Sequence, residues 1–318
     1  MQSLTKAQEN IIIDFEDFSP SVEKDFLKPP YADTLINHYT SACGLLGILN
    51  NKKLRFTEYE YLNDNTEGSY IFDFLERYLQ KNKFNYPQDF ICALFRQIDK
   101  PPYNEIYDIN CRYYFLCCFS SNSDSLPMWN YYTKTTSKAG YNIQFAYRNL
   151  YNAIFDLHAS ADEGLWFEGY KVMYSPEKQE EFLSKLLKYV LKVWQQETDD
   201  FIIRVFLNYL NSVRFAFKHS AFEPEQELRF VIKMDDKFYR TVELAKNKKN
   251  KLINFYERDG IVVPYIEVPF CKRDIKAIKL SPLIKEESAI ESVSLLLDKL
   301  GYNKRNIKID NSDIPLRY

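Results

Sequence analysis

Residues 225–232 read Glu-Gln-Glu-Leu-Arg-Phe-Val-Ile, so that charged and apolar side chains alternate along most of the stretch. Side chains of a β-strand point alternately to its two faces. The pattern therefore predicts a strand with one core face and one charged face. The core face would carry Leu228, Phe230 and Ile232, and the charged face Glu225, Glu227 and Arg229.

Two interpretations of the charged face remain open at this point. An antiparallel strand with one face in solvent can carry a Glu–Arg pair that contributes little. Packing does not require two carboxylates and a guanidinium in a row, whereas a site that stabilises a developing positive charge or grips a polar ligand does need such groups.

The patterns on either side of this strand predict an α+β fold. We expect an N-terminal arm over residues 1–30, in which Ile11–Ile13 docks as a strand. One domain follows over residues 31–318, with a helical insertion at about 176–220 that starts at Ser175-Pro176-Glu177. Other expected strands are 35–39, 54–57, 113–120, 141–147, 170–174, 260–263, 277–280 and 306–309, and expected helices include 42–50 and one from Thr66 to about Gln80.

Composition excludes several classes of protein. The chain of 318 residues has only eight glycines and contains neither G-x-G-x-x-G nor G-x-x-x-x-G-K-[ST], so Rossmann and P-loop phosphate sites are not expected. The formal net charge of −2 gives no sign of bulk nucleic-acid or membrane binding. Six cysteines without C-x-x-C, and no secretory signal or long apolar run, predict a cytoplasmic protein.

Three segments before the charged strand also carry candidate site residues. His38, Tyr39 and Thr40 end an expected strand, and hydroxyl and imidazole groups there could bind a ribose. Asn63 lies in a turn that could shape a pocket wall, although turn chemistry explains it equally well. The third segment contains Ser120, at the end of an apolar strand, and Trp129, which could stack on a planar ring or pack in the core.

The order of these segments resembles the family of unknown function DUF2971. The shared motifs are His38-Tyr39-Thr40-Ser41 before a G-x-x-x-I-L helix, then L-N-D-x-x-E, then C-F-S with D-S-L-x-M-W-x-x-Y, then E-x-E-x-R, and a late Ser312, Pro315 and Arg317. That family in turn is similar to the ADP-ribosyltransferase-like fold group, in which an early strand carries H-Y and a late strand carries E-x-E. The resemblance implies a split mixed β-sheet core of the ADP-ribosyltransferase type with helical insertions.

The resemblance also implies NAD as the substrate and assigns roles to the candidates. Glu227 would stabilise the positive charge that develops on the ribose as the nicotinamide bond breaks, a charge related to that of glycoside hydrolysis. Glu225 would orient or deprotonate an unknown protein, DNA, RNA or small-molecule acceptor. The remaining candidates would hold NAD, with ribose and nicotinamide contacts from the early strand and pyrophosphate contacts from an arginine. They are His38, Tyr39, Thr40, Arg55, Asn63, Ser120, Trp129 and Arg229.

Three alternatives stay open. Water could be the acceptor, which would make the chain an NAD glycohydrolase. A metal-dependent nuclease could use Asp64, Glu67, Glu225 and Glu227. A catalytically inactive binding or scaffold domain could keep the fold, because a fold does not guarantee an activity. Relatives of the implied type often act as toxins or in defence against phage, which serves here only as an analogy.

Overall fold

The computed structural model describes residues 4–28, 34–64, 66, 68–98, 111–133, 139–159, 164–197, 200–244, 246 and 251–316. Glu67, Arg317 and residues 247–250, which include Lys248 and Lys249, lie outside this part of the chain. The chain forms two compact units. A helical unit contains residues 1–28, 62–112 and 170–221, and a sheet unit contains residues 29–61, 113–169 and 222–318.

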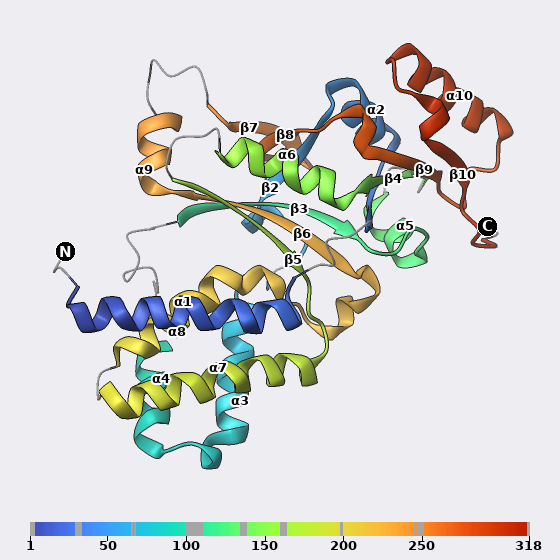
Figure 1. Cartoon of the computed structure of the whole chain (residues 1–318). Helices are drawn as coiled ribbons and strands as arrows, with labels where there is room; N and C mark the ends of the chain where they lie inside the picture. Colours follow the sequence, from blue (N-terminus) through green and yellow to red (C-terminus); the bar gives the residue numbers. More distant parts are fainter. Residues whose placement is uncertain are drawn as a thin grey trace. The chain divides into compact units, whose positions relative to one another are not determined.

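The sheet contains ten strands among the described residues (Figure 1). The main path runs β10-β9-β4-β1-β3-β2-β8-β7, and β6 pairs with both β3 and β5. Strands β10 and β9 pair in parallel, whereas β1 and β4 pair antiparallel, so the sheet is mixed. The strands are β1 (Leu35–Thr40), β2 (Lys53–Glu58), β3 (Cys111–Ser120), β4 (Tyr141–Ala146), β5 (Leu165–Lys171), β6 (Glu227–Asp235), β7 (Ile253–Arg258), β8 (Ile261–Pro269), β9 (Ile275–Leu280) and β10 (Lys308–Asn311).

Strand β3 is the branch point of this sheet, because it pairs with β1, β2 and β6. Its recorded Cα pairing with β1 is confined to Asn37 and Ser120. Its pairing with β2 lies further back, at Phe115 and Leu116. Strands β1 and β3 therefore meet at the end of β3, and this is the end beside which β6 begins.

One face of the sheet is apolar and carries the main core. Ile36, Phe119, Phe145 and Phe230 belong to this core and are almost completely buried. Buried residues of four helices pack on the same face: α2 (Ala42–Asn51), α6 (Tyr147–Ala159), α9 (Asp236–Phe238) and α10 (Glu287–Lys299). A smaller cluster of Tyr39, Met128 and Trp129 joins β1 to α5 (Leu126–Tyr132).

The helical unit consists of long amphipathic helices. In α1, the ring of Phe18 stacks on that of Tyr189 at a centroid distance of 4.2 Å, and Phe15 meets Tyr189 and Tyr209 edge-on. The helices are α1 (Lys6–Phe26), α3 (Tyr70–Asn82), α4 (Gln88–Ile98), α7 (Pro176–Glu197) and α8 (Phe201–Val213).

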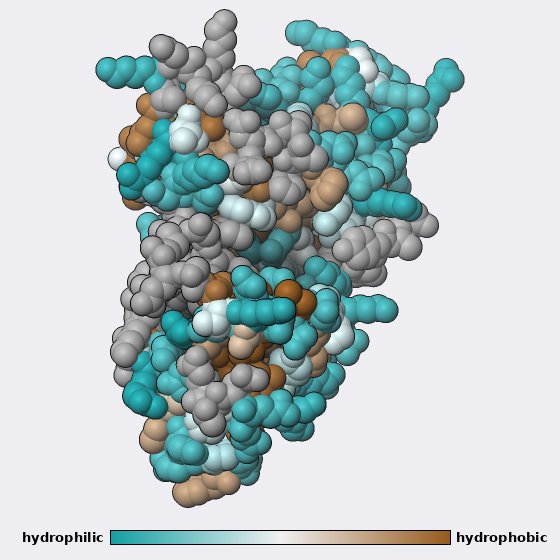
Figure 2. All heavy atoms as spheres, turned by 60° about the vertical axis from the view of Figure 1, so that its left-hand side comes forward, coloured by the Kyte–Doolittle hydropathy of each residue, from teal (hydrophilic) through white to brown (hydrophobic). Residues whose placement is uncertain are grey.

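The coloured surface on the face that Figure 2 shows is mostly hydrophilic, with smaller hydrophobic areas between. No helix of the described residues is long and apolar enough to cross a membrane.

Most of the expected elements form, and the core face of β6 is confirmed, because Leu228, Phe230 and Ile232 are all buried in the main core. The expected strand at Ile11–Ile13 is wrong, because these residues lie inside α1. A capping box between Thr5 and Gln8 starts that helix, and Ile11, Phe15 and Val22 form its buried side.

Two further boundaries differ from expectation. Helix α3 begins at Tyr70 rather than Thr66, because Asp64 accepts hydrogen bonds from the backbone N–H and the hydroxyl of Thr66 and fixes a turn there. Strand β5 begins at Leu165, before the expected 170–174. The edge strand β7 was not expected at all.

Gly164 precedes β5 with a φ of +116°, a conformation that only glycine adopts readily. A Cβ atom there would lie 2.6 Å from Oδ1 of Asp235, the side chain that caps α9. We predict that Gly164→Ala lowers the free energy of unfolding by about 1–3 kcal/mol in a urea titration.

Gly47→Ala is the matched control. A Cβ at this position meets no atom within 4 Å, and alanine is favoured over glycine inside a helix by roughly 0.5–1 kcal/mol, so this variant should be as stable as the wild type or more stable. Equal stability of the two variants would contradict the strain assigned to residue 164.

Candidate functional site

The charged face of β6 is buried rather than exposed. The side chains of Arg229 and Glu227 are 1% and 3% exposed. Oε2 of Glu227 accepts hydrogen bonds from Nη2 of Arg229 at 2.6 Å and from Nε at 2.9 Å. The interpretation of this face as a solvated Glu–Arg pair is therefore wrong.

Burial makes this ion pair costly, because both charges lose their hydration. Their mutual attraction and their hydrogen bonds must compensate for that loss. Breaking such a pair by removing one partner typically costs about 3–5 kcal/mol, yet replacing both partners by apolar residues is often neutral. The pair is thus poorly explained as a device for stability, which favours a functional interpretation.

Gln226 separates the two carboxylates and adopts a left-handed conformation, with a φ of +44°. Ser121 holds this turn twice, because its backbone N–H donates to the Gln226 carbonyl at 2.9 Å and its hydroxyl donates to Gln226 Oε1 at 3.2 Å. A non-glycine residue with positive φ costs of the order of 1 kcal/mol and persists only where its surroundings impose it. Strand β6 consequently begins at Glu227, and Glu225 ends the preceding 3₁₀ turn.

The turn brings Glu225 to helix α5. The hydroxyl of Tyr132, the last residue of that helix, donates to Oε1 of Glu225 at 2.7 Å. Burial raises the pKa of the Tyr132 phenol, and the charges of Glu227 and Glu225 raise it further. The phenol therefore stays protonated and acts as a donor at physiological pH.

A row of polar side chains lies on the sheet face opposite the core, beside this site. Asn37 Nδ2 donates to the Ser120 carbonyl at 3.0 Å. Its Oδ1 accepts from the amides of Asn142 and Gln144 on β4, each at 3.1 Å. Oδ1 of Asn142 is buried and lacks a hydrogen-bond partner among the described residues. Amides buried in this way lock β1, β3 and β4 in register.

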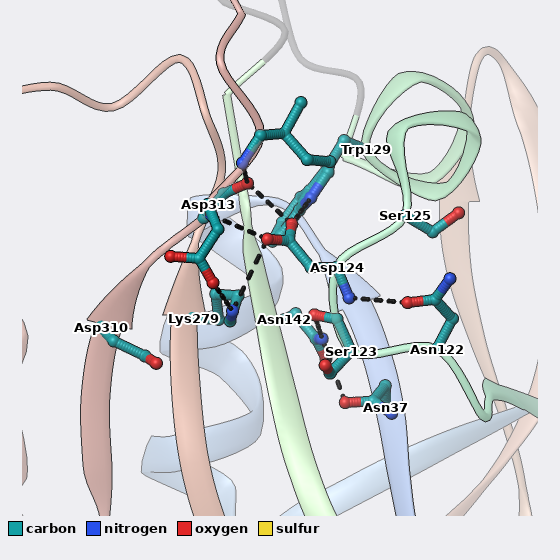
Figure 3. A network of polar contacts seen from close by, with 12 residues as sticks. Asn37, Asn122, Ser123, Asp124, Ser125, Trp129, Asn142, Lys279, Asp310 and Asp313 are labelled. Atoms are coloured by element: carbon teal, nitrogen blue, oxygen red, sulfur yellow. Dashed lines mark hydrogen bonds and ion pairs between the residues drawn. The ribbon is translucent and has the colours of Figure 1, made fainter.

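Asp124 is the centre of the network in Figure 3. Its carboxylate accepts from Trp129 Nε1 at 2.7 Å, from the Ser312 hydroxyl at 2.7 Å and from the Asp313 backbone N–H at 2.8 Å, and Lys279 Nζ lies 3.5 Å away. Burial raises the pKa of the Asp124 carboxyl, but these hydrogen bonds and the Lys279 charge outweigh it and lower the pKa below the ordinary value of 3.8. One carboxylate thus ties together α5, β9 and the C-terminal segment.

The structure places His38 on the core side of β1. His38 pairs with Ile143, its ring lies 5.5 Å from that of Phe119, and its Nδ1 lies 3.3 Å from the Cys118 carbonyl oxygen. Burial lowers its pKa below 6.5, while the Cys118 contact opposes the shift. The imidazole is thus neutral and on the opposite face from Asn37 and Tyr39.

The other candidates from β1 and β3 are held by neighbouring groups of the sheet unit. The Tyr39 hydroxyl donates to the Asn122 carbonyl at 2.9 Å and accepts from the Ser125 N–H at 3.0 Å. The Tyr39 ring meets the buried Trp129 edge-on at 4.7 Å. The hydroxyl of the fully buried Ser120 accepts from the Asn122 N–H at 3.1 Å.

Two of the remaining candidates, Thr40 and Arg55, have other neighbours within the sheet unit. Thr40 ends β1, and its hydroxyl packs so closely on Gly44 that a Cβ there would lie 1.9 Å from it. The guanidinium of Arg55 lies over the rings of Tyr256 and Tyr265, at 5.2 and 4.8 Å from their centroids. Asn63 belongs to the helical unit.

Sequence reasoning therefore found the two carboxylates and Arg229, which holds Glu227, but assigned no role to Tyr132, which holds Glu225. Tyr132 lies three residues after Trp129, so helical spacing could have indicated that both lie on one side of α5. Nothing in the sequence marks Gln226 as left-handed or Asp124 as a shared acceptor. No group of three or more His, Cys, Asp or Glu residues in the described part of the chain could hold a metal ion.

Part of the chain matches the model of a known family. The model of a family of unknown function, DUF2971, matches residues 128–230. These residues extend from α5 into β6 and include Tyr132, Glu225, Glu227 and Arg229. The match supports the family resemblance over this part of the chain. No curated protein and no solved structure gives a significant match.

We predict that Asp124→Asn lowers the free energy of unfolding by about 2–3 kcal/mol near pH 7, because a charged acceptor of several hydrogen bonds is lost. The lowered pKa means that the stabilisation is present above the ordinary carboxyl pKa and is lost as pH falls through the folded-state pKa. The difference from wild type in urea titrations should therefore shrink below about pH 4.

Asp313→Asn is the control, since that side chain is 94% exposed and pairs only with Lys279 among the recorded ion pairs. It should change stability by less than about 0.5 kcal/mol. A difference between Asp124→Asn and wild type that stays constant from pH 7 to pH 3 would contradict the charge-dependent role of Asp124.

Proposed function

We propose that this chain is an NAD-dependent ADP-ribosyltransferase that cleaves the bond between nicotinamide and ribose and transfers ADP-ribose to a macromolecular acceptor. The observation that supports this most is the pair of carboxylates at the start of β6. Glu227 is buried against Arg229 and Glu225 is held by Tyr132. Gln226, between the two carboxylates, accepts a hydrogen bond from the Ser121 N–H just after β3, and β1 pairs with the last residue of β3.

The chemistry of these groups suits the nicotinamide–ribose half of NAD. Carboxylates stabilise positive charge that develops on a ribose and accept hydrogen bonds from its hydroxyls. Both carboxylates are fixed in advance by Arg229 and Tyr132, so little reorganisation is needed during the reaction. The scarcity of glycine agrees with a site in which side chains, rather than a glycine-rich loop, contact the dinucleotide.

The proposed roles follow from these contacts. Glu227 would stabilise the developing charge, with Arg229 holding its orientation. Glu225 would orient or deprotonate the acceptor. His38 faces the core, so any contribution from it would be to the packing beneath the site rather than to ribose binding. Arg55 is an exposed residue, and its guanidinium, which packs over Tyr256 and Tyr265, is of a type suited to binding a phosphate group.

We predict that Glu227→Gln reduces NAD cleavage by about 10²–10³-fold, because it removes the charge but keeps the shape of the side chain. The measurement is release of nicotinamide from NAD by purified protein, with and without cell lysate, followed by mass spectrometry of the products. Product that appears only with lysate would identify transfer to a macromolecule. Free ADP-ribose without lysate would identify NAD glycohydrolysis instead.

Glu267→Gln is the matched control, since this carboxylate on β8 pairs with the surface residue Lys53 at 2.8 Å. It should retain wild-type turnover. Thermal unfolding of both variants separates loss of chemistry from loss of fold. Wild-type protein that neither cleaves nor binds NAD would overturn the proposal and favour a scaffold function.

A further inference from the structure

Tyr132 ends the shared motif D-S-L-x-M-W-x-x-Y, but the resemblance gives it no role. Its ring packs beside Tyr39, Met128 and Trp129, and its hydroxyl lies 2.7 Å from Oε1 of Glu225. A neutral phenol donating to a carboxylate makes a short, charge-assisted hydrogen bond, which is stronger and more directional than one between neutral groups. Tyr132 is therefore in a position to fix one oxygen of Glu225.

Both ends of this contact are held by the sheet unit. On one side, the left-handed turn at Gln226 directs Glu225 out of the line of β6, and Ser121 holds that turn through its backbone and its hydroxyl. A strained backbone conformation persists only where the surrounding structure imposes it, and such positions cluster at functional sites.

On the other side, helix α5 is anchored at its start. Trp129 donates to Asp124, which also accepts from Ser312 and from the backbone of Asp313 (Figure 3). Tyr39 holds the N-cap residue Ser125 through its N–H. The helix is only seven residues long, so these contacts determine where Tyr132, at its far end, places its hydroxyl.

We propose that Tyr132 is a positioning residue that acts through Glu225, holding that carboxylate toward the acceptor, while Arg229 holds Glu227. This inference rests on the proposed function and extends it, because it gives Tyr132 a role in acceptor activation. It follows that loss of the Tyr132 hydroxyl impairs acceptor activation and leaves NAD binding intact.

The test uses the full chain as wild type, Tyr132→Phe, Glu225→Gln and the double variant. Tyr132→Phe keeps the ring in its cluster and removes only the hydroxyl. A displaced catalytic group can cost about 10²-fold, so we expect kcat for ADP-ribose transfer to fall about 10–100-fold while KM for NAD stays within about twofold. If Tyr132 acts only through Glu225, the same change made in the Glu225→Gln background has no further effect on kcat.

Tyr302→Phe is the matched control. The Tyr302 hydroxyl donates to the Leu49 carbonyl at 2.8 Å, away from the carboxylates, and burial raises its pKa to about 12. It removes a buried phenol hydroxyl in the same way and should leave kcat unchanged. Full activity of Tyr132→Phe, or an equal loss with and without Glu225, would overturn the positioning role.

A second readout does not depend on turnover. Crystal structures of wild type and Tyr132→Phe should show Glu225 in one conformation in the first and displaced in the second. An unchanged Glu225 in the variant would overturn the positioning role by itself. Absence of NAD cleavage by the wild type would instead overturn the proposed function, and the Glu225 conformation would still decide whether Tyr132 positions it.

Discussion

The buried ion pair between Glu227 and Arg229 is the constraint on which the candidate site depends. Each charge has lost almost all contact with water and is compensated by the other across 2.6 Å. Removing one partner of a buried ion pair is typically strongly destabilising, whereas replacing both partners by apolar residues of similar volume is often neutral. The energetics of burial explain why Glu227 and Arg229 occur together, but net stability does not explain why the protein keeps a buried ion pair at this position. A requirement for a preorganised carboxylate at the start of β6 supplies that reason.

The two faces of the sheet differ in the kind of contact that they make. One face carries the apolar core that α2, α6, α9 and α10 cover. The opposite face holds amides, hydroxyls and carboxylates whose hydrogen bonds are directional and therefore fix geometry more tightly than apolar packing does. Asn37 is central to it, since its side chain joins β1 to β3 and β4. Polar groups buried in this way raise the cost of any rearrangement, which suits a site whose groups must stay within about 0.5 Å of one geometry.

The sequence allowed the alternation along β6 to be recognised because a period of two depends only on neighbouring residues. The buried state of the charged face could not be predicted, since it depends on which elements cover it. His38 shows the same limit. Its position at the end of a strand was correct, but the face it occupies follows from its pairing with Ile143. The role of Tyr132 depends on a residue 93 positions away, and no local pattern records a contact of that range.

Gln226 illustrates how this chain manages with few glycines. Glycine is the usual residue where the backbone must turn left-handed, because it lacks the Cβ that makes the conformation costly. Here a glutamine takes that conformation. Its side chain accepts a hydrogen bond from Ser121, which offsets part of the conformational strain. A glycine could form the turn but could not make that contact, and it would leave the two carboxylates joined by a more flexible link. The strain at Gln226 is therefore better understood as the means by which Glu225 and Glu227, two residues apart in the chain, reach different partners on α5 and β6.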